Sequence, residues 1–264
     1  MEKINKLKSK FKEYNVDGYL IPKNDEFFNE YVPHHKDDLQ YISNFSGSYG
    51  LALILKKNNF LFVDGRYTVQ ANLQSGKNFK ILTLPLIRNQ ISASFKNKVI
   101  GFDPRLFNEE FIQLFSKKLG IRCISLNNNL IKLIKEKKII PKKRNYFYVL
   151  DKSVTGKSCQ EKLKNLKTYI KKNSLDIMLI TSSENVAWLL NIRGRDSNFS
   201  PIPNCFLLVD KQMNVFLFCD LKKIDIKFRK KLNFITVLKT NELDNFLYRI
   251  NNKNFLIDKS TCSI

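Results

Sequence analysis

Hydrophobic residues along the chain change between two spacings, and these spacings predict alternating helices and strands. Ile4, Leu7 and Phe11 recur at helical spacing among charged residues, so residues 3–14 are predicted to form an amphipathic helix. Apolar runs bounded by polar turns, such as residues 18–22, predict short strands. Alternating elements of this kind favour a mixed β-sheet with helices packed on it.

The same order of predicted elements occurs in both halves of the chain. A helix, a strand, a helix and a hairpin are predicted at residues 3–14, 18–22, 37–47 and 51–64, and again at 161–172, 177–181, 184–194 and 206–220. The first half continues with strands at 79–84, 98–102 and 121–126 and a helix at 108–120. The predicted fold class is α/β, with two related domains that are each a mixed β-sheet flanked by helices.

A polar, basic stretch at residues 127–156 holds the predicted domain boundary, with domain I at 1–140, a linker at 141–156 and domain II at 157–264. Residues 155–158 read T-G-K-S, but the phosphate-loop motif GxxxxGK[ST] requires a glycine where Asp151 stands. Ser158, followed three residues later by Glu161, instead predicts a helix capping box.

The composition is globular, with 43% hydrophobic and 27% charged residues. No apolar run reaches the ~20 residues of a membrane span, and the first residues lack the apolar core of a signal peptide. We therefore expect a cytoplasmic protein with no membrane partner. The five cysteines form no CxxC pair and are odd in number, which argues against a disulfide framework and a zinc ribbon.

The formal net charge of +22 raises the question of nucleic-acid binding. Lysine greatly outnumbers arginine, although arginine is the better bidentate reader of phosphate and guanine. The lysines are scattered along the whole chain, and abundant Asn, Ile and Phe indicate a compositional bias. We therefore attribute the high positive charge to compositional bias and expect no nucleic-acid partner.

Three motifs together resemble the two N-terminal domains of the Xaa-Pro aminopeptidase (aminopeptidase P) family. Residues 23–55 hold E-Y followed by Pro, and then F-x-G-S-x-G; residues 61–71 hold D-G-R-Y-x-x-Q-A; and residues 184–209 hold a helix followed by N-x-R-G-x-D. The resemblance covers roughly residues 5–262 in the family's domain order. It implies creatinase/prolidase-type domains and a third, metal-binding domain that this chain is expected to lack.

The resemblance also implies what the parent protein does and what this chain does not do. The family removes the N-terminal residue that precedes proline, using two metal ions (typically manganese) on two Asp, one His and two Glu, and its members form homodimers. Here the only histidines are His34 and His35, which match no ligand motif of the family. Adjacent side chains seldom chelate one ion, so we expect two exposed loop residues, no bound cofactor and no catalytic residues.

Two residues are predicted to bind substrate because of the resemblance. Arg66 is the arginine of D-G-R-Y, which in the family belongs to the substrate-binding surface, and a guanidinium grips a peptide carbonyl or carboxylate in a fork. Glu30, which precedes Tyr31, is predicted to pair with Arg66 or with a free peptide amine. The competing interpretation of Arg66 is a surface arginine paired with Asp64.

The N-x-R-G-x-D motif at residues 191–196 predicts structure more than function. Gly194 is predicted to end the helix at 184–194, with Arg193 complementing the helix dipole. Trp188 is predicted to pack in the core of the second domain, because apolar residues surround it along the helix. Asp37 and Asp38 are predicted to cap the helix at 37–47.

Two functional hypotheses follow. The first is a non-catalytic, substrate-positioning and dimer-forming part of an Xaa-Pro aminopeptidase, which meets Xaa-Pro peptides only with a catalytic domain present. The alternative is a stand-alone module that binds peptides or nucleic acid without catalysis.

The charge hypothesis is testable with duplex DNA. We expect no salt-dependent retention of a DNA duplex at micromolar protein in a gel-shift titration, because scattered lysines form no continuous phosphate-binding stripe. Binding that weakens steeply with added salt would contradict the compositional interpretation.

Overall fold

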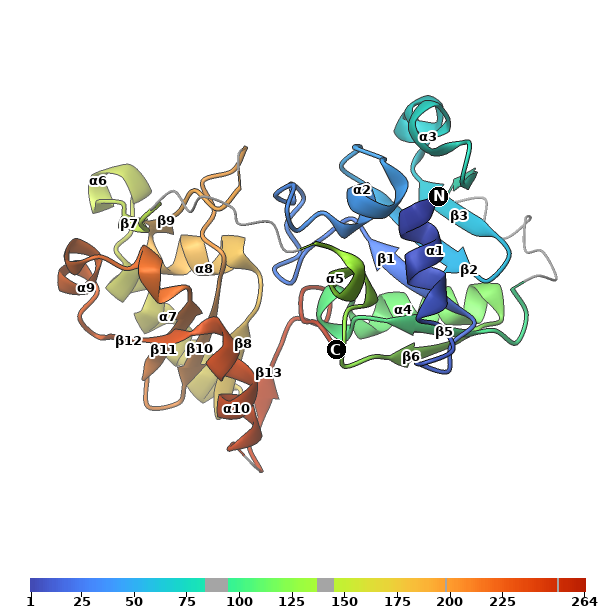
Figure 1. The fold of residues 1–264 in the computed structure, drawn as a ribbon. Coiled ribbons are helices and arrows are strands. Elements are labelled where there is room, and N and C mark those ends of the chain that lie inside the picture. Colours follow the sequence, from blue (N-terminus) through green and yellow to red (C-terminus); the bar gives the residue numbers. More distant parts are fainter. Residues whose placement is uncertain (84–94, 137–144, 198, 251) are drawn as a thin grey trace. The chain divides into compact units, whose positions relative to one another are not determined.

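The computed structural model describes residues 1–83, 95–136, 145–197, 199–250 and 252–264. The chain divides into two compact units, Met1–Ile140 with Ser263–Ile264, and Pro141–Cys262 (Figure 1). Of the predicted linker, residues 141–144 lie outside the described part, and the remainder carries two short elements of the second unit, β7 (Tyr148–Val149) and α6 (Lys152–Thr155). Across the described ranges, no helix is both long and apolar enough to cross a membrane.

The described part of the first unit contains a six-stranded sheet in the order β4-β3-β2-β1-β5-β6. Its strands are β1 (Gly18–Pro22), β2 (Gly50–Leu55), β3 (Asn59–Val63), β4 (Lys80–Thr83), β5 (Val99–Phe102) and β6 (Arg122–Ser125). Its helices are α1 (Glu2–Ser9), α2 (Asp38–Ser43), α3 (Thr68–Ser75), α4 (Glu109–Leu119) and α5 (Leu130–Ile134), with 3-10 turns at Gly65–Tyr67 and Pro104–Leu106. Strand β1 runs antiparallel to β2 and parallel to β5, so the predicted mixed sheet is confirmed.

Both faces of this sheet are covered by helices. Successive strand residues point to opposite faces, so Tyr19 and Ile21 share a cluster with residues of α1, α2, α3 and α5. Leu20, between them, belongs to the cluster that contains α4 residues. Figure 1 accordingly shows α4 on the opposite side of the sheet from α1 and α2. Double-sided burial explains why β1 and β2 are apolar throughout and do not alternate.

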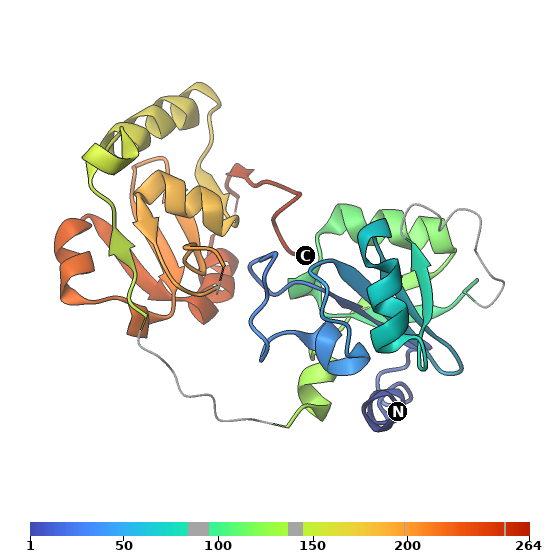
Figure 2. The ribbon, with the colours of Figure 1, turned by 90° about the horizontal axis from the view of Figure 1, so that it is seen from above.

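The described part of the second unit contains a five-stranded sheet in the order β12-β11-β10-β8-β13. Its strands are β8 (Ile177–Ile180), β10 (Cys205–Asp210), β11 (Val215–Cys219), β12 (Ile235–Lys239) and β13 (Phe255–Leu256), while β7 pairs separately with β9 (Ile192–Arg193). Its longer helices are α7 (Cys159–Lys172), α8 (Ser183–Leu190), α9 (Ile226–Lys231) and α10 (Leu243–Tyr248). Residues of α7 and α8 share one core cluster, and Figure 2 shows these helices together; α10 packs into the other cluster.

The predicted relationship between the two halves appears in their strand pairing. Strands β1, β2 and β3 form an antiparallel meander that continues to a parallel β4, and β8, β10, β11 and β12 repeat this arrangement. A further parallel strand, β5 or β13, joins the other side of the first strand of each meander. The predicted two mixed α/β domains are therefore confirmed.

Local signals at the starts of two helices are also confirmed. The Ser158 hydroxyl accepts a hydrogen bond from the Glu161 amide (3.2 Å), while the Glu161 carboxylate accepts one from the Ser158 amide (2.6 Å). The carboxylate of Asp37, just before α2, accepts a hydrogen bond from the Gln40 amide (2.9 Å).

The predicted end of the helix at 184–194 was wrong. Helix α8 ends at Leu190, because Asn191 adopts the left-handed conformation (φ 56°) that terminates a helix, as Asn44 does after α2 (φ 64°). Gly194 therefore lies beyond the helix. Arg193 still complements the helix end, since its guanidinium donates a hydrogen bond to the carbonyl of Ala187 (3.2 Å).

The core position predicted for Trp188 was also wrong, because this residue is 61% exposed. Its helix buries Val186, Leu189 and Leu190, and at 3.6 residues per turn Trp188 falls on the other face. The buried Lys162 of α7 places its ammonium 4.3 Å from the centre of the Trp188 ring. The same ammonium donates hydrogen bonds to the Trp188 carbonyl (2.6 Å) and to Oδ1 of Asn191 (2.5 Å).

Lys162 therefore connects α7 to the end of α8. Burial, together with the charges of Arg193 and Lys157, lowers the pKa of Lys162 below its usual value. The ammonium is nevertheless stabilised by carbonyl oxygens at the negative end of the α8 dipole and by the aromatic ring.

We expect Lys162→Met to lower the free energy of unfolding by about 1–3 kcal/mol, because it removes the donor shared by the Trp188 carbonyl and the buried Oδ1 of Asn191. Urea unfolding measures this change. Lys164→Met, at an exposed position of the same helix, is the matched control and should change stability little. Equal stabilities of the two variants would contradict the stabilising role of Lys162.

Candidate functional site

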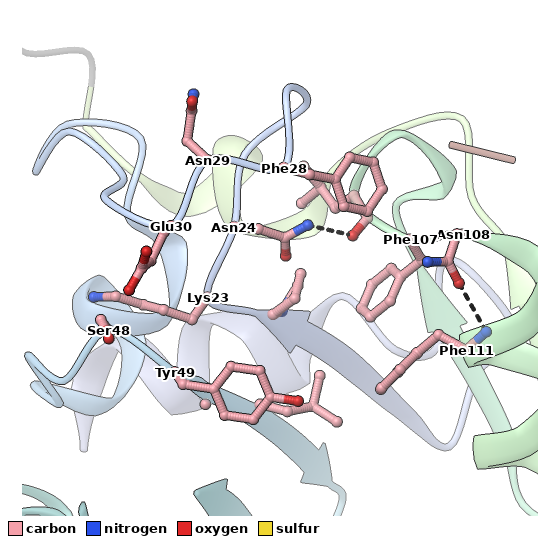
Figure 3. Close-up of a pocket in the computed structure, with 14 residues that line it drawn as sticks. Lys23, Asn24, Phe28, Asn29, Glu30, Ser48, Tyr49, Phe107, Asn108 and Phe111 are labelled. Atoms are coloured by element: carbon pink, nitrogen blue, oxygen red, sulfur yellow. Dashed lines mark hydrogen bonds between the residues drawn. The ribbon is translucent and has the colours of Figure 1, made fainter. Parts of the chain in front are cut away.

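A pocket of about 330 Å³ opens in the first unit where β1 and β5 end (Figure 3). The two strands are parallel neighbours, so their carboxyl ends meet at one edge of the sheet. From β1 the chain continues to β2, β3 and β4 on one side, and from β5 it continues to β6 on the other. Such a topological switch point is where open α/β sheets place their ligand sites.

Three chain segments line the pocket, at residues 22–30, 48–51 and 106–111. Its apolar lining residues are Pro22, Phe28, Tyr49, Leu51, Leu106, Phe107 and Phe111. Its polar lining residues are Lys23, Asn24, Asn29, Glu30, Ser48 and Asn108. The amide nitrogen of Asn24 donates to the carbonyl of Leu106 (3.0 Å) and so joins the segment after β1 to the segment after β5 (Figure 3).

The segment after β1 is held by a buried carboxylate. Asp25, which is 2% exposed, accepts hydrogen bonds from the amides of Phe27 (3.0 Å) and Asn29 (3.3 Å). Between them, Phe28 takes a positive φ of 56°, which is strained for a bulky residue. The carboxylate therefore holds the turn that presents Phe28 and Glu30 to the pocket.

Lys23, although it lines the pocket, already has an anionic partner. Its ammonium forms a buried ion pair with Asp37, the residue that caps α2. Nearby, burial raises the pKa of Glu26, but the charge and the hydrogen bond of Lys36, whose Nζ lies 2.6 Å from the carboxylate, together with weaker contributions outweigh burial. The pKa of Glu26 therefore lies below its usual value. The charges next to the pocket on this side are thus neutralised within the protein.

The F-x-G-S-x-G and D-G-R-Y motifs pack against each other beside the pocket. The rings of Phe45 and Tyr67 meet edge to face at 5.7 Å, and the Tyr67 hydroxyl lies 2.9 Å from Oγ of Ser48. A side chain at Gly47 would overlap the Phe45 ring and approach Cδ1 of Tyr67 to 2.9 Å. Only glycine fits there without displacing an aromatic ring, which gives the motif a physical reason.

Arg66, on the 3-10 turn after β3, is exposed and pairs with Asp64. Its Nη2 lies 2.7 Å from the Asp64 carboxylate, and its Nε lies 3.2 Å from both carboxylate oxygens. The hydrogen bond and charge of Asp64 raise the pKa of Arg66, and the negative charge of Glu30 adds to this effect. In the part of the chain that the structure describes, no hydrogen bond engages Nη1 of Arg66, so that edge of the guanidinium faces solvent.

The structure separates the two residues predicted to bind substrate. Glu30 lines the pocket, whereas Arg66 stands beside it and connects to it through the Tyr67 ring (5.3 Å) and Ser48. The ion pair of Arg66 is with Asp64, as the competing interpretation held, and Glu30 acts on it through charge alone. Substrate binding by either residue stays a prediction.

Sequence reasoning missed the aromatic lining. Phe28, Tyr49, Phe107 and Phe111 come from three distant segments, and no motif joins them. Residues that follow parallel neighbouring strands meet at one edge of the sheet, so the strand order would have located these residues. The strand order cannot be read from the sequence, because it depends on β5 pairing with β1.

The donor set does not fit a two-metal centre. His34 and His35 are exposed, and His34 hydrogen-bonds Gln40 (2.9 Å). Among the described residues, no group of three His, Cys, Asp or Glu side chains is placed to hold a metal ion. Burial raises the pKa of the Cys159 thiol to about 11, so the thiolate that acts as a nucleophile is disfavoured there.

Fold and pocket define a pair of related α/β domains, the first with a ligand-sized pocket at its switch point. Family models of the creatinase/prolidase N-terminal domain match residues 3–134 and 140–264. The chain belongs to this family and carries two such domains.

Its relatives are Xaa-Pro aminopeptidases. Xaa-Pro aminopeptidase 1 of Dictyostelium discoideum is 31% identical over 88% of this chain and 39% of the relative. A probable Xaa-Pro aminopeptidase P of Laccaria bicolor is 29% identical over 89% of this chain and 38% of the relative. The crystal structure of X-prolyl aminopeptidase from Caenorhabditis elegans, described as a cytosolic enzyme with a di-nuclear active site, superposes with a TM-score of 0.81 at 26% identity, over 93% of this chain and 43% of that one. The chain thus spans about two fifths of these proteins' length and matches their N-terminal part.

We expect Gly47→Ala to lower the free energy of unfolding by roughly 1–3 kcal/mol, because the added methyl group forces the Phe45 and Tyr67 rings apart. Urea unfolding followed by tyrosine fluorescence measures it. Gly65→Ala, in the partner motif, adds a methyl group into open space and serves as the control. A Gly47→Ala protein as stable as Gly65→Ala would contradict the tight packing.

Proposed function

We propose that this chain forms the N-terminal, substrate-positioning part of an Xaa-Pro aminopeptidase, a protein that removes the residue preceding proline from a peptide. The observation that carries the proposal is the junction of the two family motifs beside the pocket, where Tyr67 connects Arg66 to Ser48. It presents a cation and, in Glu30, an anion on one side of the first unit. Such a pair suits a peptide, which carries both charges.

Arg66 is suited to hold the carbonyl or carboxylate end of a peptide. Asp64 engages Nε and Nη2 and thereby orients the guanidinium plane without covering its outer edge. An arginine oriented in this way loses less side-chain freedom on binding than a free one does. Its Nη1 edge is the group that would donate to a peptide oxygen.

The chemistry of hydrolysis would be supplied by residues outside these 264. Metal-assisted hydrolysis needs a ligand set that holds the ions and lowers the pKa of a bound water, and the two adjacent histidines here do not provide one. Dimer formation and a cytoplasmic location are part of the same proposal. The description of the Caenorhabditis elegans relative as cytosolic supports the location.

The proposal predicts peptide binding without turnover. Purified chain with manganese and Gly-Pro-Pro should release no glycine, by amino-acid analysis, and should retain no pair of manganese ions after gel filtration. It should bind Gly-Pro-Pro saturably in isothermal titration calorimetry, and Arg66→Ala should weaken that binding roughly 10-fold, the effect of losing a charge-assisted hydrogen bond.

Arg122→Ala is the matched control, since Arg122 is exposed and begins β6 at the opposite edge of the same sheet. Release of glycine by the purified chain would disprove the absence of catalysis. Equal affinities of the Arg66→Ala and Arg122→Ala proteins would disprove the role of Arg66.

A further inference from the structure

Two hydrogen-bond acceptors in the pocket are open to a ligand. Glu30 forms no hydrogen bond or ion pair within the described residues, and its carboxylate is exposed at the pocket. The amide nitrogen of Asn24 is engaged by Leu106, which leaves its oxygen on the Tyr49 side of the pocket (Figure 3). The cation at the pocket, Lys23, is neutralised by Asp37. A ligand that brings hydrogen-bond donors and positive charge would satisfy both acceptors.

The walls of the pocket are aromatic. Phe107 and Phe111 stack with their centroids 5.7 Å apart, and in Figure 3 Tyr49 stands across from them while Phe28 lies above Phe107. Aromatic faces attract apolar groups and cations alike. The volume of about 330 Å³ is at the lower end for small-molecule sites, and it suits one large side chain more than a whole cofactor.

Phe28, which lines the pocket, has a strained backbone conformation. Phe28 has a φ of 56°, and a bulky residue in this region costs on the order of 1 kcal/mol or more. The hydrogen bonds that the buried Asp25 accepts on either side maintain that conformation. The pocket is therefore shaped before a ligand arrives.

We infer that this pocket takes the N-terminal residue of a peptide whose first side chain is large and apolar. The free ammonium group lies at Glu30, and the side chain lies among Phe28, Tyr49 and Phe111. The inference rests on the proposed function and adds to it a preference for large apolar residues before proline. Arg66, beside the pocket, remains available for an oxygen further along the same peptide.

Calorimetry of the chain with Phe-Pro-Pro, Gly-Pro-Pro, N-acetyl-Phe-Pro-Pro and 2-phenylethylamine tests the inference. We expect Phe-Pro-Pro to bind about 10–100-fold more tightly than Gly-Pro-Pro, in the range that filling an apolar pocket supplies. N-acetylation removes the positive charge and should weaken binding at least 10-fold, as should Glu30→Gln on the protein side.

Two substitutions test whether the aromatic walls of the pocket hold the first side chain of the peptide. Phe111→Ala should erase the advantage of Phe-Pro-Pro over Gly-Pro-Pro, and Tyr49→Ala does the same at a half-exposed position where folding is not at risk. Tyr248→Ala, 84% exposed in the second unit, is the control and should leave the ratio unchanged.

The outcomes separate this inference from the proposed function. If Gly-Pro-Pro binds as tightly as Phe-Pro-Pro and Arg66→Ala weakens both, the proposed function stands and the pocket assignment is overturned. If 2-phenylethylamine binds in a Glu30-dependent manner while no Xaa-Pro peptide binds, both are overturned, because the pocket then serves another amine.

Discussion

The parallel pairing of β1 with β5 is the constraint on which the candidate site depends. It joins Gly18 to Ile100 and Tyr19 to Gly101, and so brings together two segments about eighty residues apart in the chain. A Cβ atom at Gly101 would lie 2.7 Å from Cδ1 of Leu126, so side chains pack closely against the paired strands β1 and β5. Because the chain leaves β1 and β5 in opposite directions, their ends diverge and leave space that the flanking segments line with aromatic residues.

The second unit repeats the sheet of the first, but the segments at its equivalent junction are arranged differently. Its equivalent junction lies between β8 and β13, and the chain after β13 returns so that Thr261 lies 3.0 Å from Thr181, the residue after β8. In the first unit the corresponding segments carry Asn24 and Phe107. The two related topologies thus carry different loops at this edge of the sheet, and loops on a shared scaffold are where sites usually differ.

Polar side chains near the site act mainly on the backbone. Asp25, Asp37 and Asp64 each accept a hydrogen bond from a nearby main-chain amide, and each also contacts a lysine or arginine. A loop whose main-chain amides donate hydrogen bonds to a nearby carboxylate needs few long-range contacts to keep a defined shape. This leaves Glu30, which lacks such a bond among the described residues, as the carboxylate at the pocket that is available to a ligand.

The sequence by itself determined the helix–strand–helix–hairpin order repeated in the two halves, the capping residues at 37 and 158 and the family, because these depend on periods and motifs within short windows. It placed Trp188 wrongly, because apolar neighbours in sequence do not say which face of a short helix meets the core. Only the tertiary structure decided that β5 lies beside β1, that Tyr67 packs on Phe45 and Ser48, and that aromatic residues from three segments form one pocket. Strand pairing and side-chain packing join residues far apart in the chain, and no local pattern specifies them.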